Sequence, residues 1–265
     1  MFNPSLVNLK SLSASLNTYG KEGPFDHCVI DNFFTETIAY ELEKEFPSFG
    51  SDIWHSYNNP LEVKKTCNNW NSFAPKTYQV FAFLNSDEFL SILTSTAFSN
   101  QTLYSDVGLH GGGWHIHKNG GKLNTHLDYS IHPKLGLQRK LNIIIYLNSN
   151  WKKSWGGELG FWENNTKEKP GKLVKKIEPK FNRAVLFDTT QNSWHGLPNP
   201  VLSPEGELRK SLAIYYLCHP SENSDKRGKA LYVPTDEQSN DKEVLDLIKK
   251  RANIDTASSV YSTKK

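Results

Sequence analysis

The sequence predicts an α+β fold that is mostly β, because helical patterns come early in the chain and strand patterns follow them. From residue 103 onward, short runs of β-branched and aromatic residues are bounded by glycines and other turn residues. About six such strands, together with an early candidate at residues 25–31, are enough to build a double-sheet jelly roll. We therefore expect a jelly roll with supporting N-terminal helices and a C-terminal helical tail.

Two early segments carry the spacing of amphipathic helices. Residues 35–46 follow Thr35, a suitable N-cap residue, place apolar side chains four residues apart and end before Pro47. Residues 87–96 follow Ser86, another N-cap residue, and carry an apolar stripe. Both segments are predicted to be helices that pack on one side of the sheets.

The strand candidates are apolar runs that recur through the second half of the chain. They cover residues 141–147, 158–162, 173–177, 183–188 and 210–217. The polar, Asn-rich stretch 58–75 predicts a loop, and residues 241–252 predict one amphipathic helix. We divide the chain into residues 1–102, a strand and helical support region of the same domain, residues 103–220, the jelly-roll core, and residues 221–265, a C-terminal extension.

Composition excludes several classes of protein. The 265 residues include 31 basic and 28 acidic side chains, a net charge of +3, which gives no electrostatic reason to expect a nucleic-acid partner. No apolar run approaches the roughly 18 residues of a membrane span, and the N-terminus lacks a signal-peptide pattern. The absence of such a run predicts no membrane partner. Three scattered cysteines without a CxxC pair argue against a disulfide framework, so a reducing cytoplasm is expected.

The residues with the strongest chemical pattern are His126, Asp128 and His195. Each lies close to a predicted strand, where a turn histidine or a turn-forming aspartate would be the ordinary interpretation. Together, however, two neutral imidazoles and one carboxylate are the ligands of a non-haem ferrous iron that keeps open positions for other molecules. The sequence thus predicts a metal centre at the ends of the strands.

The surrounding residues carry a resemblance to a known family. Its motifs are Gly111–Asp128, Arg139–Asn148, Trp155–Leu159, Pro179–Phe187, Trp194–Gly196 and Arg209–Tyr216. Their order and spacing resemble the 2-oxoglutarate and Fe(II)-dependent oxygenases, and within them the prolyl 4-hydroxylase-like branch, over roughly residues 105–218. The resemblance implies a double-stranded β-helix with Fe(II) at one end of the barrel, 2-oxoglutarate as cosubstrate, O₂ as oxidant and ascorbate as reductant.

The resemblance also implies roles for individual residues. His126, Asp128 and His195 would be the metal ligands and the catalytic set, and Arg209 would grip the distal carboxylate of 2-oxoglutarate with its planar guanidinium. A surface arginine is the alternative for Arg209, and a core tyrosine is an equal alternative for Tyr146, whose family position bonds the same carboxylate. Asn142 shares the strand face of Tyr146 and could line the cosubstrate pocket.

His115 and His117 form a second histidine pair that allows two interpretations. They resemble the His-x-His of a cupin, but no Glu follows in residues 118–128, which weakens that reading. His115 or His117 could instead line the cosubstrate pocket. The usual tyrosine of related hydroxylases is missing from this strand, so the contacts to the keto-acid end stay open.

The resemblance implies a dioxygenase that hydroxylates an aliphatic C–H, foremost a prolyl residue, and releases succinate and CO₂. The carboxylate at position 128 fills a site that a halide could otherwise take, which favours hydroxylation over halogenation. An alternative is the same chemistry on a small molecule, such as a free amino acid, a sugar or a nucleotide-sugar. Another class is a non-catalytic carbohydrate-binding jelly roll, which would stack sugars on Trp114, Trp155, Trp162 and Trp194.

Overall fold

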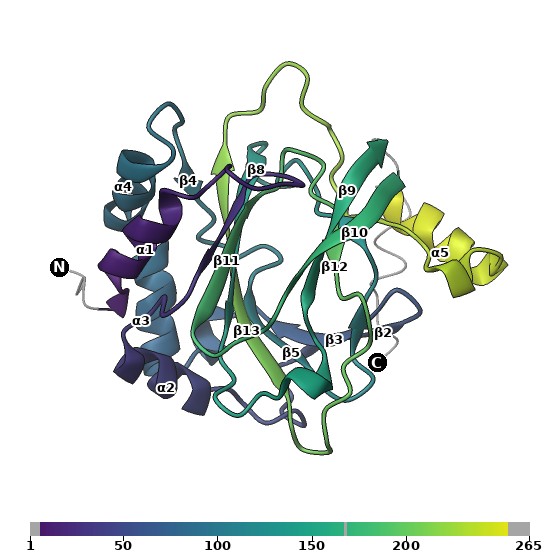
Figure 1. Cartoon of the computed structure of the whole chain (residues 1–265), viewed down its shortest axis with the longest axis horizontal. Coiled ribbons are helices and arrows are strands. Elements are labelled where there is room, and N and C mark those ends of the chain that lie inside the picture. The colour runs from purple at the N-terminus through teal and green to yellow at the C-terminus, as the bar shows by residue number, and fades with distance from the viewer. Residues whose placement is uncertain (1–5, 167–168, 254–265) are drawn as a thin grey trace.

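Two antiparallel β-sheets face each other in the computed structural model, which describes residues 6–166 and 169–253 (Figure 1). The larger sheet has the strand order β1-β11-β8-β13-β5-β3-β2, with β4 paired to β13 and β6 paired to β3. The smaller sheet has the order β10-β9-β12-β7-β14. The predicted jelly-roll architecture is therefore confirmed.

The strands of the larger sheet come from all parts of the chain up to residue 218. Their bounds are β1 (His27–Ile30), β2 (His55–Asn59), β3 (Glu62–Cys67), β4 (Tyr104–Ser105), β5 (Gly113–His117), β6 (Lys122–Leu123), β8 (Gln138–Tyr146), β11 (Arg183–Asp188) and β13 (Arg209–Cys218). The apolar runs at 141–147, 183–188 and 210–217 are thus adjacent central strands, as their buried pattern predicts.

The smaller sheet contains one long hairpin and three very short strands. Their bounds are β7 (His126–Leu127), β9 (Leu159–Thr166), β10 (Lys169–Ile177), β12 (His195–Gly196) and β14 (Leu231–Tyr232). Strand β14 belongs to the C-terminal extension and pairs with β7. A helix, α5 (Lys242–Ala252), follows β14 and confirms the predicted C-terminal helix. Residues 254–265 of the extension lie outside the described part.

Helices cover the outer face of the larger sheet, on the side away from the smaller sheet (Figure 1). They are α1 (Leu9–Leu16), α2 (Glu36–Lys44), α3 (Pro75–Leu84) and α4 (Asp87–Thr96). The Ser86 side chain accepts a hydrogen bond from the Phe89 amide at the start of α4, as predicted for its N-cap. Thr35 occupies the N-cap position of α2 but makes no side-chain cap.

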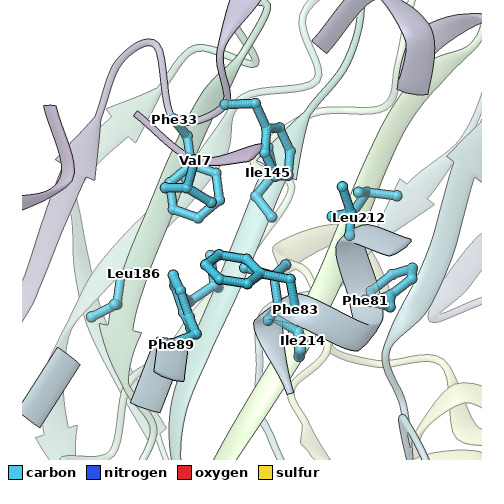
Figure 2. Packing of buried hydrophobic residues seen from close by; sticks show 14 of the residues in the cluster. Val7, Phe33, Phe81, Phe83, Phe89, Ile145, Leu186, Leu212 and Ile214 are labelled. Carbon is cyan, nitrogen blue, oxygen red and sulfur yellow. The ribbon is translucent and has the colours of Figure 1, made fainter. Parts of the chain in front are cut away.

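The main hydrophobic core lies between these helices and the larger sheet. Figure 2 shows Phe83 and Phe89 of the helices in one cluster with Ile145, Leu186 and Ile214 of the sheet. Successive residues of a strand point to opposite faces, so Asn142, Ile144 and Tyr146 of β8 point the other way, toward the smaller sheet. The sheet therefore has one face that holds the core and one face that can build a site.

One sequence-based expectation was wrong. Residues 58–75 were expected to form a loop, but β2 ends and β3 lies within them, and they extend the larger sheet beyond β5. These two strands are polar and partly exposed, so they lack the apolar alternation that predicts a strand. No helix among the described residues is long and apolar enough to cross a lipid bilayer.

Candidate active site

Two histidines lie side by side where the short strands of the smaller sheet meet. His126 opens β7, His195 opens β12, and the two residues pair directly across the strands. Asp128 follows β7, and its two carboxylate oxygens lie 3.8 Å from the Nε2 atoms of His126 and His195. One potential ligand atom from each of the three residues lies within 4.8 Å of the others. Sequence positions far apart are thus brought to one point.

Backbone carbonyls fix the orientation of both imidazoles. The Nδ1 of His126 lies 2.9 Å from the carbonyl oxygen of Asn124, and the Nδ1 of His195 lies 2.8 Å from that of Ser193. With Nδ1–H donating to these carbonyls, each Nε2 keeps a lone pair directed at Asp128. Burial lowers the pKa of His126 to about 3 and also lowers that of His195. Both rings are therefore neutral near pH 7, the state in which imidazole binds a metal.

Asp128 receives its partners from the larger sheet. Arg139 lies with Nη1 3.5 Å from Oδ1, and the Asn142 side-chain amide donates to Oδ2 at 3.3 Å. Burial raises the pKa of Asp128, but the opposing charges, with the Arg139 guanidinium first among them, outweigh it and hold the pKa below its usual value. The carboxylate is consequently ionised. Two neutral imidazoles and one carboxylate with this spacing fit a ferrous ion.

A cavity of about 430 Å³ opens in front of the three residues and extends between the two sheets. Asn142, His117 and Arg209 line it, together with His115. Arg209 is 3 % exposed, and its Nε donates a 2.7 Å hydrogen bond to the carbonyl oxygen of Gly157. Gly157 has φ +77°, and a Cβ there would lie 2.9 Å from Cδ of Arg209, so a glycine suits this contact.

Tyr146 lies behind the Arg209 guanidinium, whose Cζ is 4.8 Å from the centre of the tyrosine ring. Its ring packs in the core between the sheets and does not line the cavity. Its hydroxyl and both ring nitrogens of His117 are buried without a hydrogen-bond partner among the described residues. Burial, reinforced by Arg209, lowers the pKa of His117, so this ring is neutral. A buried cation beside unsatisfied polar atoms fits a ligand that carries a carboxylate, such as 2-oxoglutarate.

Sequence reasoning assigned no role to Arg139, although it opens one of the quoted motifs. The guanidinium is sandwiched between Tyr129 and Tyr215, with Cζ 3.5 and 3.3 Å from the two ring centres. Its Nη2 donates to the carbonyl oxygen of His110 at 2.6 Å. A planar cation stacked on both faces cannot turn away from Asp128. The position of Arg139 near the start of a buried strand is the sequence signal for such a role.

The alternatives from the sequence receive less support. His115 and His117 line the cavity, but neither belongs to the three-residue ligand group found within the described residues. None of the seven tryptophans lines this cavity, and Trp114 and Trp194 are buried. The tryptophans of the described part of the chain therefore do not form the predicted sugar-stacking wall in this cavity.

A pair of facing antiparallel sheets that carries these three residues at one end defines a jelly roll with a candidate metal site. Comparison of the sequence with protein families makes the class specific, because residues 112–217 match the profile of the 2OG-Fe(II) oxygenase superfamily. This part of the chain is therefore similar to the 2OG-Fe(II) oxygenases, and the predicted resemblance to prolyl hydroxylases is confirmed. Fe(II), 2-oxoglutarate and O₂ are the cofactor and cosubstrates of that superfamily.

The relatives are prolyl hydroxylases. The chain is 30% identical over 105 residues to the prolyl 3-hydroxylase OGFOD1 of Xenopus laevis, a match that covers 38% of this chain but only 20% of the relative. A prolyl hydroxylase of Trichoplax adhaerens, solved with a peptide of the hypoxia inducible factor, has a similar fold with a TM-score of 0.56 at 19% identity, covering 79% of this chain and 89% of that one. A prolyl-4-hydroxylase of Pseudomonas putida also gives 0.56, at 15% identity, covering 79% and 100%.

Proposed function

We propose that this protein is an Fe(II)- and 2-oxoglutarate-dependent dioxygenase that hydroxylates an aliphatic C–H, foremost that of a prolyl residue, and releases succinate and CO₂. The observation that carries the proposal is the convergence of His126, Asp128 and His195 on one point beside a buried arginine. The prolyl substrate is supported by the relatives, which are prolyl hydroxylases. In such sites the iron and the keto acid together supply the oxidising chemistry.

The residues of the chain would orient the reactants and keep water out. His126, Asp128 and His195 would hold the metal from one side, which leaves its other positions free for cosubstrate and O₂. Arg209 would donate hydrogen bonds to the distal carboxylate of 2-oxoglutarate in the buried end of the cavity. Tyr146 does not line the cavity, so its expected bond to this carboxylate is replaced by packing behind the guanidinium. His117 would complete that end of the pocket, while Asn142 would steady Asp128.

The second candidate is the same reaction on a small molecule. Its support is the size of the cavity, because about 430 Å³ lies in the range of pockets that enclose small ligands. A cytoplasmic location is part of the proposal, since Cys28, Cys67 and Cys218 are all free thiols, as expected in a reducing compartment. Ascorbate as reductant stays a prediction.

The experiment compares the wild type with Asp128→Ala, using Fe(II), 2-oxoglutarate, O₂ and a panel of prolyl peptides. The wild type should form succinate and add one oxygen atom to the accepted peptide, which mass spectrometry detects. Asp128→Ala should form no succinate, because the metal loses its only anionic protein ligand. Full turnover by this variant would contradict the ligand assignment. A melting temperature of the variant close to that of the metal-free wild type, together with loss of metal binding in a direct titration, separates this effect from unfolding.

A further inference from the structure

The cavity has a wall that the oxygenase motifs do not include. It is built by β2 and β3 on one side and by the C-terminal extension on the other, with Tyr57, Lys64, Tyr232 and Arg251 among its lining residues. Tyr232 stacks on His126 with ring centres 5.0 Å apart and 17° between the planes. Residues of β2 and β3 and residues of the C-terminal extension therefore come together directly beside the proposed metal ligands.

Glu62 is the centre of this wall. It is 1% exposed and forms ion pairs with Lys64, at 3.0 Å, and with Arg251, whose side chain reaches it from α5. The Tyr232 hydroxyl donates to the same carboxylate at 3.3 Å. Burial raises the pKa of Glu62, but Lys64 and Arg251 outweigh it and lower the pKa to about 2. One carboxylate is thus shared by a lysine of β3 and an arginine of α5.

The lining of the whole cavity contains more basic than acidic residues. Its described basic residues are Lys64, Arg139, Arg209, Lys229 and Arg251, against the acidic Glu62 and Asp128. Bound Fe(II) and the two carboxylates of 2-oxoglutarate add equal and opposite charges. The described lining therefore keeps more basic than acidic side chains when both are bound, and Lys64 is the basic residue placed across His117 from Arg209. A cavity lined by one sign of charge favours a ligand of the other sign.

The register of the strands separates this excess from the cosubstrate site. Arg209 of β13 pairs with His117 of β5, and Lys65 of β3 pairs with Ile116, which brings Lys64 alongside His117 on the cavity face. Arg209 and Lys64 consequently lie on opposite sides of His117, two strand spacings apart, or about 10 Å. A molecule anchored at Arg209 and directed toward the metal leaves Lys64 for a second ligand.

We propose that the wall formed by Lys64, Glu62 and Arg251 binds an anionic group of the substrate, a carboxylate or a phosphate, close to the C–H that reacts. This inference rests on the proposed function for the identity of the second ligand as substrate. Lys64 donates to the anion from inside the cavity, while Glu62, which Arg251 holds in turn, keeps the lysine in place. The C-terminal extension is then part of the substrate site through α5 and β14.

The test uses the full-length protein with Zn(II) in place of iron and saturating 2-oxoglutarate, so that no turnover occurs and Arg209 is occupied. The probes are small carboxylates and phosphate monoesters, each paired with its uncharged amide or alcohol, and binding is followed by ligand-observed NMR. The anionic members should bind at least about tenfold more tightly than their neutral counterparts, as one charge-assisted hydrogen bond provides.

The variants locate the effect. Lys64→Met should remove the preference, and Lys64→Arg should keep it. Lys65→Met is the matched control, since its Nζ bonds the carbonyl oxygen of Phe49 on the opposite face of β3, so it should bind the probes like the wild type. Absence of anion binding in the wild type, equal binding of acid and amide, or a preference that survives in Lys64→Met would overturn the proposal. Failure of 2-oxoglutarate to bind in a metal-dependent manner would instead overturn the proposed function.

Discussion

Asp128 is oriented by residues of the sheet opposite to the one that carries it. It follows β7 of the smaller sheet, whereas Asn142 and Arg139 lie on β8 of the larger sheet. Hydrogen bonds to a metal-binding carboxylate restrict its rotation and keep it in the geometry that the ion requires. Asn142 donates a hydrogen bond to this carboxylate. The contact indicates that Asn142 positions the proposed metal ligand, in addition to its predicted place in the lining of the cosubstrate pocket.

We therefore expect Asn142→Leu, which conserves size but removes the donor to Oδ2, to weaken metal binding by about tenfold. At saturating metal, the affinity for 2-oxoglutarate should change by less than about twofold, because Arg209 is untouched. Metal titration and cosubstrate titration monitored by calorimetry measure the two affinities separately. The reverse pattern, with normal metal binding and weak cosubstrate binding, would show that Asn142 acts on the cosubstrate instead.

At the scale of elements, β5 joins the oxygenase core to the additional wall, the cavity wall that contains Lys64, Glu62 and Arg251. It pairs with β13 on one side and with β3 on the other, and it carries His115 and His117 into the cavity. Gly113 begins this strand with φ +92°, and a Cβ there would lie 2.1 Å from the carbonyl oxygen of Cys67. The approach of β3 to β5 thus depends on the missing side chain.

Gly113→Ala should lower the free energy of unfolding by at least about 2 kcal/mol more than Gly120→Ala does. Gly120 is the matched control because it also has a positive φ, +75°, but a Cβ there meets nothing within 4 Å, so only the backbone cost of about 1 kcal/mol applies. Equilibrium denaturation with urea measures both values. Equal destabilisation by the two substitutions would show that β3 moves away at little cost.

The elements that the sequence predicts well are those with a strong pattern. The apolar runs of β8, β11 and β13 and the capped helix α4 appear where expected. Helix α1, rich in serine, and helix α3, rich in aromatic residues, were not predicted because their propensities are weak for helices. In contrast, β7 and β12 have two residues each, too short for any periodicity, and only the ligand motif marked them.

The additional wall could not be predicted from local sequence. Glu62 and Lys64 read as the polar residues of a loop, and Arg251 reads as the solvent-exposed face of an amphipathic helix. Their burial depends on a contact between positions 189 residues apart. Local patterns contain no information about such pairing, whereas the motifs of residues 112–217 are shared with the superfamily and mark their own site.

At the scale of the whole molecule, the proposed ligands would connect the two sheets. His126 and His195 belong to the smaller sheet, whereas Arg209 belongs to the larger one. A metal bound to the histidines and a cosubstrate that spans from the metal to Arg209 would stabilise the folded state, because neither site exists in the unfolded chain. Keto acids of different length can separate the contributions that the metal and Arg209 make to this stabilisation.

Under anaerobic conditions with Fe(II), 2-oxoglutarate at about 100 times its dissociation constant should add about 2.7 kcal/mol to stability. For a chain of this size, the melting temperature should then rise by about 5 to 10 °C, which calorimetry or dye fluorescence detects. Pyruvate at the same concentration should give a much smaller rise, because it has the keto-acid end but no carboxylate for Arg209. In Arg209→Met, compared with its own ligand-free melting temperature, the two keto acids should give the same small rise. An undiminished response of this variant to 2-oxoglutarate would place the distal carboxylate elsewhere in the cavity.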